Sequence, residues 1–124
     1  MREIKFQIYW VAGHEMLYDT NNDLEFRDKE NYWITDLSDA INHPESYKVR
    51  QYTGLKDKNG VEIYEGDIIS CTQQRFSTNG IVTMHHGMWN WQYKKGAVSL
   101  LYEANKKWEG TVIGNIYENP ELAK

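Results

Sequence analysis

The sequence predicts an α+β protein in which β structure dominates, with an N-terminal β segment and one short helix followed by a small SH3-like β-barrel. Aromatic residues are abundant, with five Trp, nine Tyr and three Phe among 124 residues, and aromatic side chains favour strands. Short alternating stretches recur between turn-forming residues, most regularly in the second half. The SH3-like assignment is an analogy between folds, based on a strand entered through Gly66-Asp67.

The length of the chain fits a single domain with two parts, an N-terminal β/α part at residues 1–50 and a barrel-like part at residues 51–124. In the first part we expect a strand at residues 2–11, because apolar and polar side chains alternate there. A turn at residues 12–15 then leads into a second strand at residues 16–18. The apolar face of the first strand contains Ile4, Phe6, Ile8 and Trp10.

The next residues predict another pair of strands and a helix. Residues 24–26 and 32–34 can pair across the turn-forming residues 28–31. Thr35 or Asp36 is expected to cap a short helix, because both side chains can accept a hydrogen bond from a free amide of the first turn. The buried face of this helix is expected to contain Leu37, Ala40 and Ile41.

The pattern is more regular in the second half. Strands at residues 52–55 and 61–64 flank a turn that ends in Asn59-Gly60, a pair that supplies the positive φ angles of tight hairpins. A second turn is expected at Thr78-Asn79-Gly80. Five further strands at intervals of about ten residues are typical of a sandwich or barrel; they are expected at residues 68–72, 81–84, 89–93, 97–102 and 111–117.

Charge is distributed unevenly along the chain. The net charge is −4; residues 1–50 contain six basic and ten acidic residues, and residues 51–124 contain eight of each. A protein that grips duplex nucleic acid through its phosphates normally has a basic face. The charge balance therefore argues against sequence-independent binding of a duplex.

Cysteine content and hydropathy favour a cytoplasmic protein. Cys71 is the single cysteine, so an internal disulfide and a cysteine-based zinc site are excluded. No apolar run reaches the roughly 18 residues that a membrane-spanning helix needs. The N-terminal residues alternate at once and show no signal-peptide pattern.

Three segments together resemble the YopX family, small proteins of phages and prophages of Gram-positive bacteria. These segments are MREIKF at residues 1–6, QYTGLKDKNG continuing to EIYEGDI between residues 51 and 68, and IGNIYENPEL at residues 113–122. The chain departs from the family pattern where Gln7-Ile8-Tyr9 replaces an Arg-Ala-Trp-like run, and residues 13–48 match no part of it. Any function carried by that insert is left open.

The resemblance implies a β-rich domain with a barrel-like C-terminal part, acting in the host cytoplasm as an accessory or regulatory factor. It implies no particular activity, cofactor or catalytic residue. Most residues of the shared segments can be explained by turns, in which Gly, Asp and Asn are favoured, and Asp67 is expected to bind amides of the preceding turn. The alternative is a shared binding surface built by Tyr52, Tyr64 and Tyr117.

No group of residues predicts catalysis, a metal site or a cofactor. His85 and His86 would point to opposite faces of a strand, although in a turn they could converge. Cys71 lies in an apolar strand and is expected in the core. The carboxylates between residues 19 and 39 are expected to form a solvated acidic surface. We therefore expect a protein that is not an enzyme.

One aromatic strand remains as a candidate binding site. Trp89, Trp91 and Tyr93 fall on one face and are followed by Lys94 and Lys95. This face can be core, a protein interface or a stacking surface for single-stranded nucleic acid.

The function we predict is a non-catalytic accessory protein that binds another macromolecule, with protein as the favoured partner, and the acidic residues 19–39 can supply charge complementarity. The alternative is a regulator that binds nucleic acid through the barrel and Lys94, Lys95, Lys106 and Lys107. No membrane partner is expected, and self-association is left open.

Overall fold

The computed structural model describes residues 4–73, 76–94, 96–99 and 110–123, and the chain divides into two compact units. The N-terminal unit is Glu3–Gln51 and the C-terminal unit is Tyr52–Lys124. Each unit has its own hydrophobic core. Among the described residues, no helix is long and apolar enough to cross a membrane.

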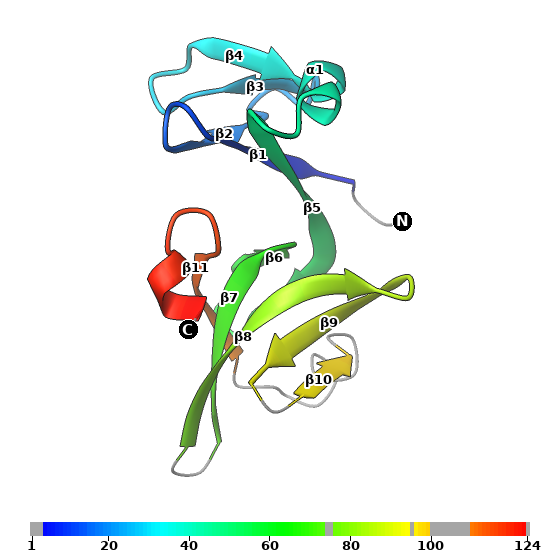
Figure 1. The fold of residues 1–124 in the computed structure, drawn as a ribbon, viewed down its shortest axis with the longest axis vertical. Helices are drawn as coiled ribbons and strands as arrows, with labels where there is room; N and C mark the ends of the chain where they lie inside the picture. Colours follow the sequence, from blue (N-terminus) through cyan, green and yellow to red (C-terminus); the bar gives the residue numbers. More distant parts are fainter. Residues whose placement is uncertain (1–3, 74–75, 95, 100–109, 124) are drawn as a thin grey trace. The chain divides into compact units, whose positions relative to one another are not determined.

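The N-terminal unit is an antiparallel sheet with one helix packed on it (Figure 1). The strand order is β4-β3-β2-β1-β5, and β5 continues into the C-terminal unit, where it pairs with β6. The predicted strands are found with different ends: β1 covers residues 6–10 of the expected 2–11, of which residues 2–3 lie outside the described part, and β5 begins at Tyr47 rather than at residue 52. The elements are β1 (Phe6–Trp10), β2 (Glu15–Tyr18), β3 (Glu25–Arg27), β4 (Trp33–Asp36), α1 (Leu37–Asn42) and β5 (Tyr47–Lys56).

Alternation along the strands explains the core of this unit. Ile8 lies opposite Leu17, and both side chains are fully buried together with Phe26. Phe6 and Trp10 pack against the same cluster, as the pattern of β1 predicts. Ile4 lies outside β1 and is exposed, so it does not extend this face.

The helix begins directly after the predicted cap residue Asp36, but one of its side chains points elsewhere. Asp36 is the N-cap and accepts a hydrogen bond of 2.7 Å from the amide of Asp39, which confirms its capping role. Ala40 is buried and Leu37 packs on the core, whereas Ile41 is 59% exposed. Each helical residue advances by about 100°, so the step from Ala40 to Ile41 turns that side chain away from the sheet.

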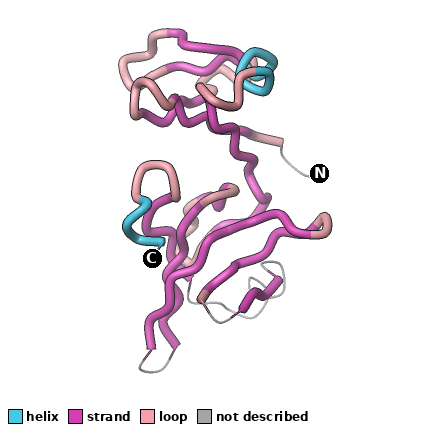
Figure 2. The backbone as a smooth tube through the Cα atoms, in the orientation of Figure 1, coloured by secondary structure: helices cyan, strands magenta, loops and turns pink. Residues whose placement is uncertain are grey.

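The C-terminal unit consists mostly of strands (Figure 2). Its larger sheet is antiparallel with the order β10-β9-β8-β7-β11. All five strands expected there are found, although the predicted residues 100–102 of the fourth lie outside the described part. The elements are β6 (Glu62–Tyr64), β7 (Asp67–Gln73), β8 (Phe76–His85), β9 (Met88–Tyr93), β10 (Gly96–Ser99), β11 (Gly110–Asn115) and the 3₁₀ helix η1 (Pro120–Ala123).

The predicted SH3-like barrel is not confirmed. A closed barrel requires its two outermost strands to pair, whereas here β10 pairs with β9 and β11 pairs with β7. In the part of the chain that the structure covers, the sheet is therefore open. Its core contains Ile69, Cys71, Val82 and Trp91 together with Ile63 from β6.

The predicted turn at Asn79-Gly80 is wrong. Both residues lie inside β8, where Gly80 pairs with Ile69 on one side and Tyr93 on the other. A Cβ atom added at Gly80 would lie 2.5 Å from Nε1 of Trp91. This glycine therefore allows the indole of Trp91 to lie against the backbone of a central strand.

Candidate protein-binding groove

The aromatic strand is largely part of the core. Trp91 is 6% exposed, and its Nε1 donates a 3.1 Å hydrogen bond to the backbone oxygen of Ile69. The ring of Tyr93 stacks on Trp91 with 5.1 Å between centroids. Trp89 and Tyr93 are partly buried and pack against the same core. Of the three alternatives for this strand, the core therefore applies to Trp91. Its ring is not available to a partner in this arrangement.

The lysines of the predicted basic surface are mostly outside the described residues. Lys94 follows β9 and is exposed. Lys95, Lys106 and Lys107 lie outside the described part of the chain. No described contact tests whether these lysines and the aromatic strand bind nucleic acid, so nucleic-acid binding stays a prediction.

The tyrosines of the YopX-like segments do not form an open surface. Tyr52 and Tyr64 are both buried, and their ring centroids lie 5.4 Å apart. Tyr117 is partly buried. Two of the three proposed anchors would thus have to leave the core before they could bind a partner.

Polar residues of the same segments hold the backbone. Asp67 accepts a 2.7 Å hydrogen bond from the amide of Tyr64, which confirms its predicted role. Asn115 accepts hydrogen bonds from the amides of Tyr117 and Glu118 at 3.0 and 2.8 Å. These contacts satisfy buried or partly buried amides of turns, so the identity of Asp67 and Asn115 follows from folding of the C-terminal unit.

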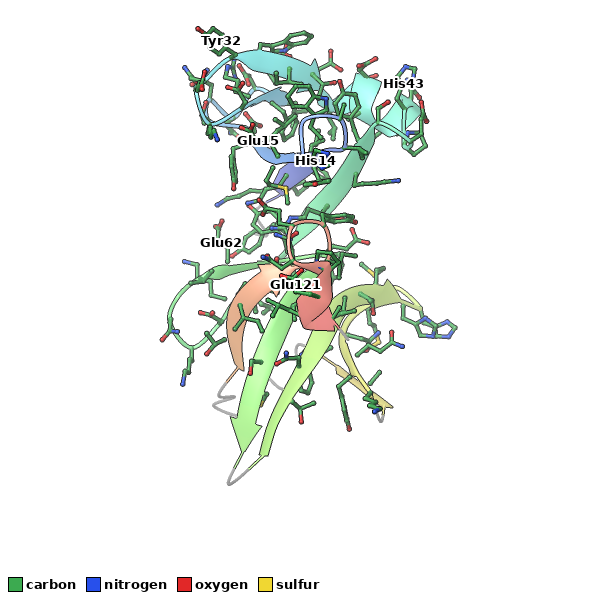
Figure 3. The ribbon with its side chains drawn as sticks, turned by 60° about the vertical axis from the view of Figure 1, so that its left-hand side comes forward. His14, Glu15, Tyr32, His43, Glu62 and Glu121 are labelled. Atoms are coloured by element: carbon green, nitrogen blue, oxygen red, sulfur yellow. The ribbon has the colours of Figure 1, made fainter. Side chains whose placement is uncertain are left out.

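The candidate metal-binding and nucleophilic residues are scattered. Cys71 is buried in the core, as predicted. His14 lies in the turn between β1 and β2, and His43 lies directly after α1, as Figure 3 shows. Within the described ranges, no three His, Cys, Asp or Glu side chains are grouped to hold a metal ion. His85 and His86 lie at a hairpin turn, and their rings are in contact.

A groove that the sequence did not predict lies in the N-terminal unit. Its volume is about 420 Å³, within the range of ligand-binding clefts. Apolar side chains of Leu24, Leu37 and Ile41 line it. The amide of Leu37 donates a 3.0 Å hydrogen bond to the backbone oxygen of Leu24, which joins the loop before β3 to the start of α1. The other lining residues are Asp23, Glu25, Asp36, Ser38 and Asn42.

The loop at the groove is held in a strained conformation. Leu24 has φ = 62°, a left-handed conformation that costs a residue with a Cβ about 1–2 kcal/mol. The carboxylate of Asp19 accepts 3.0 Å hydrogen bonds from the amides of both Asp23 and Leu24. These bonds stabilise the loop in a form that leaves Leu24 46% exposed. An exposed apolar side chain held at such cost points to a functional use.

The groove is acidic. Of the eight described residues that line it, Asp23, Glu25 and Asp36 are acidic and none is basic. The guanidinium of Arg27 lies 3.5 Å from the carboxylate of Asp23, so one positive charge lies beside the three acidic residues. Desolvation acts to raise the pKa of Asp23, but hydrogen bonds from the Glu25 amide and Arg27, with the charge of Arg27, lower it overall. Asp23 is therefore negatively charged at neutral pH.

Exposed aromatic side chains lie in the same unit. The indole Nε1 of Trp33 donates a hydrogen bond to the carboxylate of Glu25, so the ring lies next to a lining residue. Trp33 is 56% exposed. Tyr32, which precedes β4, points away from the ribbon in Figure 3 and is also exposed. Trp and Tyr are the residues most enriched among binding hot spots.

The groove could have been suspected from one feature of the sequence. Residues 19–39 contain seven acidic and two basic residues, and this excess was predicted to form a charged surface. Of the apolar side chains at the groove, Leu37 and Ile41 are expected on one face of the helix, and Leu24 is expected in a strand. The groove results from Leu24 and Ile41 pointing outward, and neither orientation follows from periodicity.

Comparisons with known proteins agree over the whole chain. A family model described as YopX protein matches residues 5–124. The crystal structure of protein EF1440 from Enterococcus faecalis is similar, with a TM-score of 0.67 and 26% sequence identity, covering 100% of both chains. No curated protein matches the sequence.

Proposed function

The chain belongs to the YopX family, and we propose that it is a non-catalytic phage or prophage accessory protein that binds a basic peptide segment of another protein. The groove of the N-terminal unit is the binding site in this proposal. The observation that carries it is an exposed apolar surface, Leu24 and Ile41, bordered by the carboxylates of Asp23, Glu25 and Asp36. A segment with an apolar anchor between Lys or Arg residues has the complementary chemistry.

The apolar side chains supply the affinity. Burying one Leu- or Ile-sized anchor from water contributes about 1.5–3 kcal/mol. Ile41 lies on the outward side of α1. Its removal from water on binding adds a further favourable free energy of apolar burial. Because the helix is held to the sheet by Ala40 and Leu37, Ile41 is free to contact a partner without loss of the core.

The carboxylates supply selectivity for a basic segment. Pairs between exposed charges contribute only about 0.2–1 kcal/mol each, but they speed association and disfavour acidic competitors. Two of these three carboxylates also accept hydrogen bonds from backbone amides: Asp23 accepts from Glu25 and Asp36 accepts from Asp39. Their positions are therefore fixed before a partner arrives, which supports binding rather than proton transfer as their role.

The alternative proposal places nucleic acid on the basic residues after β9. Lys94 is exposed there, and such binding would weaken steeply with salt and disappear after nuclease treatment. No contact among the described residues favours it over the groove.

The experiment is a titration of ¹⁵N-labelled protein with a designed basic peptide that carries Leu anchors between Lys residues. Amide shifts should concentrate at Leu24, Leu37 and Ile41. A peptide of the same length with Glu in place of Lys should bind more weakly, and the difference should shrink as salt is raised.

Two matched variants locate the site. Ile41→Lys places a charge on the groove and should weaken binding by about 30-fold, because about 2 kcal/mol of apolar burial is lost. Val61→Lys makes the same change at another exposed apolar side chain, in the C-terminal unit, and should bind like the parent. Equal binding by the two variants, or equal binding of the two peptides, would contradict the proposal.

A further inference from the structure

The hairpin tip, His85–Met88, joins β8 to β9 through a two-residue loop. His85 pairs with Met88, which leaves His86 and Gly87 between the strands. Their φ angles are 52° and 76°, as a type I′ turn requires at both positions. Asn or Asp is the usual first residue of this turn. Histidine also tolerates a positive φ, so the turn places an imidazole at the tip of the hairpin.

The turn brings two imidazoles together. The ring centroids of His85 and His86 lie 4.1 Å apart, with an angle of 66° between the ring planes. Neighbours on a regular strand would point to opposite faces, but the left-handed backbone of His86 removes that separation. Both residues are exposed. Each neutral imidazole carries one nitrogen lone pair, so the hairpin tip holds two possible nitrogen donors close together.

A thioether belongs to the same hairpin tip. Met88 lies directly across from His85 in the last pair of the hairpin, so both side chains lie on the same face. Met88 is 53% exposed, whereas Met is normally used to fill core gaps. The side chain of Asn90 donates to the backbone oxygen of Met88 at 3.2 Å, which holds the start of β9 beside the turn.

We propose that the hairpin tip binds copper(I) through His85, His86 and Met88. Thioether ligands select soft ions such as copper(I), and imidazole also suits copper. Copper(I) accepts two or three ligands, whereas structural zinc requires four. The described residues provide no cluster of three His, Cys, Asp or Glu side chains for a harder ion. This site is separate from the groove and does not depend on the proposed function.

The test supplies copper(I) anaerobically to the full chain and follows the ¹³C-labelled methyl groups of its methionines. The methyl signal of Met88 should shift and saturate at one equivalent. Met84 precedes His85 and points to the other face of β8, so its signal should change less. A site-resolved signal is needed because Cys71 is also a soft ligand, although it is buried.

Variants make the result decisive. His86→Asn should abolish the Met88 shift while it leaves the fold intact, because Asn suits a type I′ turn. Met84→Leu is the matched control and should still bind one equivalent through Met88. His43→Asn, in the other unit, should also retain the site. A Met88 shift that persists in His86→Asn, or its absence in the parent protein, would overturn the proposal.

Discussion

Replacement of Asp57 by Ala should destabilise the C-terminal unit more than any exposed charge does. The carboxylate of Asp57 is buried and accepts three backbone hydrogen bonds. Its Oδ1 binds the amides of Asn59 and Val61 at 2.8 and 2.9 Å, and its Oδ2 binds the amide of Val112 at 2.9 Å. One side chain thereby joins the turn between β5 and β6 to the distant strand β11.

The magnitude follows from these three bonds. A hydrogen bond to a charged acceptor contributes about 1.5–3 kcal/mol, and an amide left buried without a partner costs a similar amount. The turn amides of Asn59 and Val61 can bind water in the variant, which recovers part of the lost hydrogen-bond energy. We therefore expect Asp57→Ala to lower the free energy of unfolding by about 3–5 kcal/mol.

The assay is urea unfolding followed through the indole N–H signal of Trp91, whose buried hydrogen bond to Ile69 reports on this unit. Asp57→Asn keeps one acceptor oxygen for the turn but directs an amide donor at Val112, so about half of the loss is expected. Glu121→Ala removes the same charge from an exposed residue of η1 and should change stability by less than about 0.5 kcal/mol. Equal effects of Asp57→Ala and Glu121→Ala would refute the reasoning.

Three further changes test the packing and capping contacts. Trp91→Ala should cost about 3–5 kcal/mol, measured by urea unfolding, because a large core side chain and its hydrogen bond are lost; a folded, stable variant would mean that Trp91 is not core. Gly80→Ala should cost about 1–3 kcal/mol in the same assay, since its Cβ would overlap the Trp91 ring. Asp36→Ala removes the N-cap of α1 and should destabilise the N-terminal unit by about 1 kcal/mol, measured by amide hydrogen exchange at Ala40; unchanged exchange would exclude a capping role.

The strands of the N-terminal unit could be predicted because their turns carry clear local signals. Asn22 and Asn31 have φ angles of 56° and 70°, and asparagine tolerates this region better than most residues. Asp28 accepts hydrogen bonds from the amides of Glu30 and Tyr32, which closes the turn before β4. Local chemistry of this kind is visible in sequence, so β3 and β4 can be predicted without the family resemblance. The expectation that residues 13–48 match no part of the family is wrong, because the family model covers residues 5–124.

Features that depend on distant contacts could not be predicted. Asn79-Gly80 has the composition of a turn, yet Gly80 is required in a central strand by the ring of Trp91. Whether the second sheet closes depends on which strands meet at its edges, and spacing along the chain does not determine this. Helical spacing from Leu37 predicts Ile41 on the buried face, but the side of α1 that packs on the core carries Leu37 and Ala40 and leaves Ile41 exposed.

The candidate site was also only partly visible. The acidic excess of residues 19–39 was read correctly as surface, since Asp23 and Asp39 are exposed. Its apolar component was missed because Leu24 is exposed only in a left-handed backbone conformation that Asp19 stabilises. Conversely, the aromatic alternation of β9 is a pattern that a core strand and a binding strand share, and burial of Trp91 distinguishes them.

The most direct test of the central claim is photo-crosslinking in nuclease-treated bacterial lysate, with a photoreactive amino acid placed at residue 41 and, as a control, at residue 61. Both side chains are exposed in the parent protein. The groove proposal predicts that residue 41 crosslinks to a peptide segment rich in Lys or Arg around an apolar anchor, that residue 61 does not, and that added salt reduces the product. The same adducts at both positions, or an acidic segment at residue 41, would contradict it.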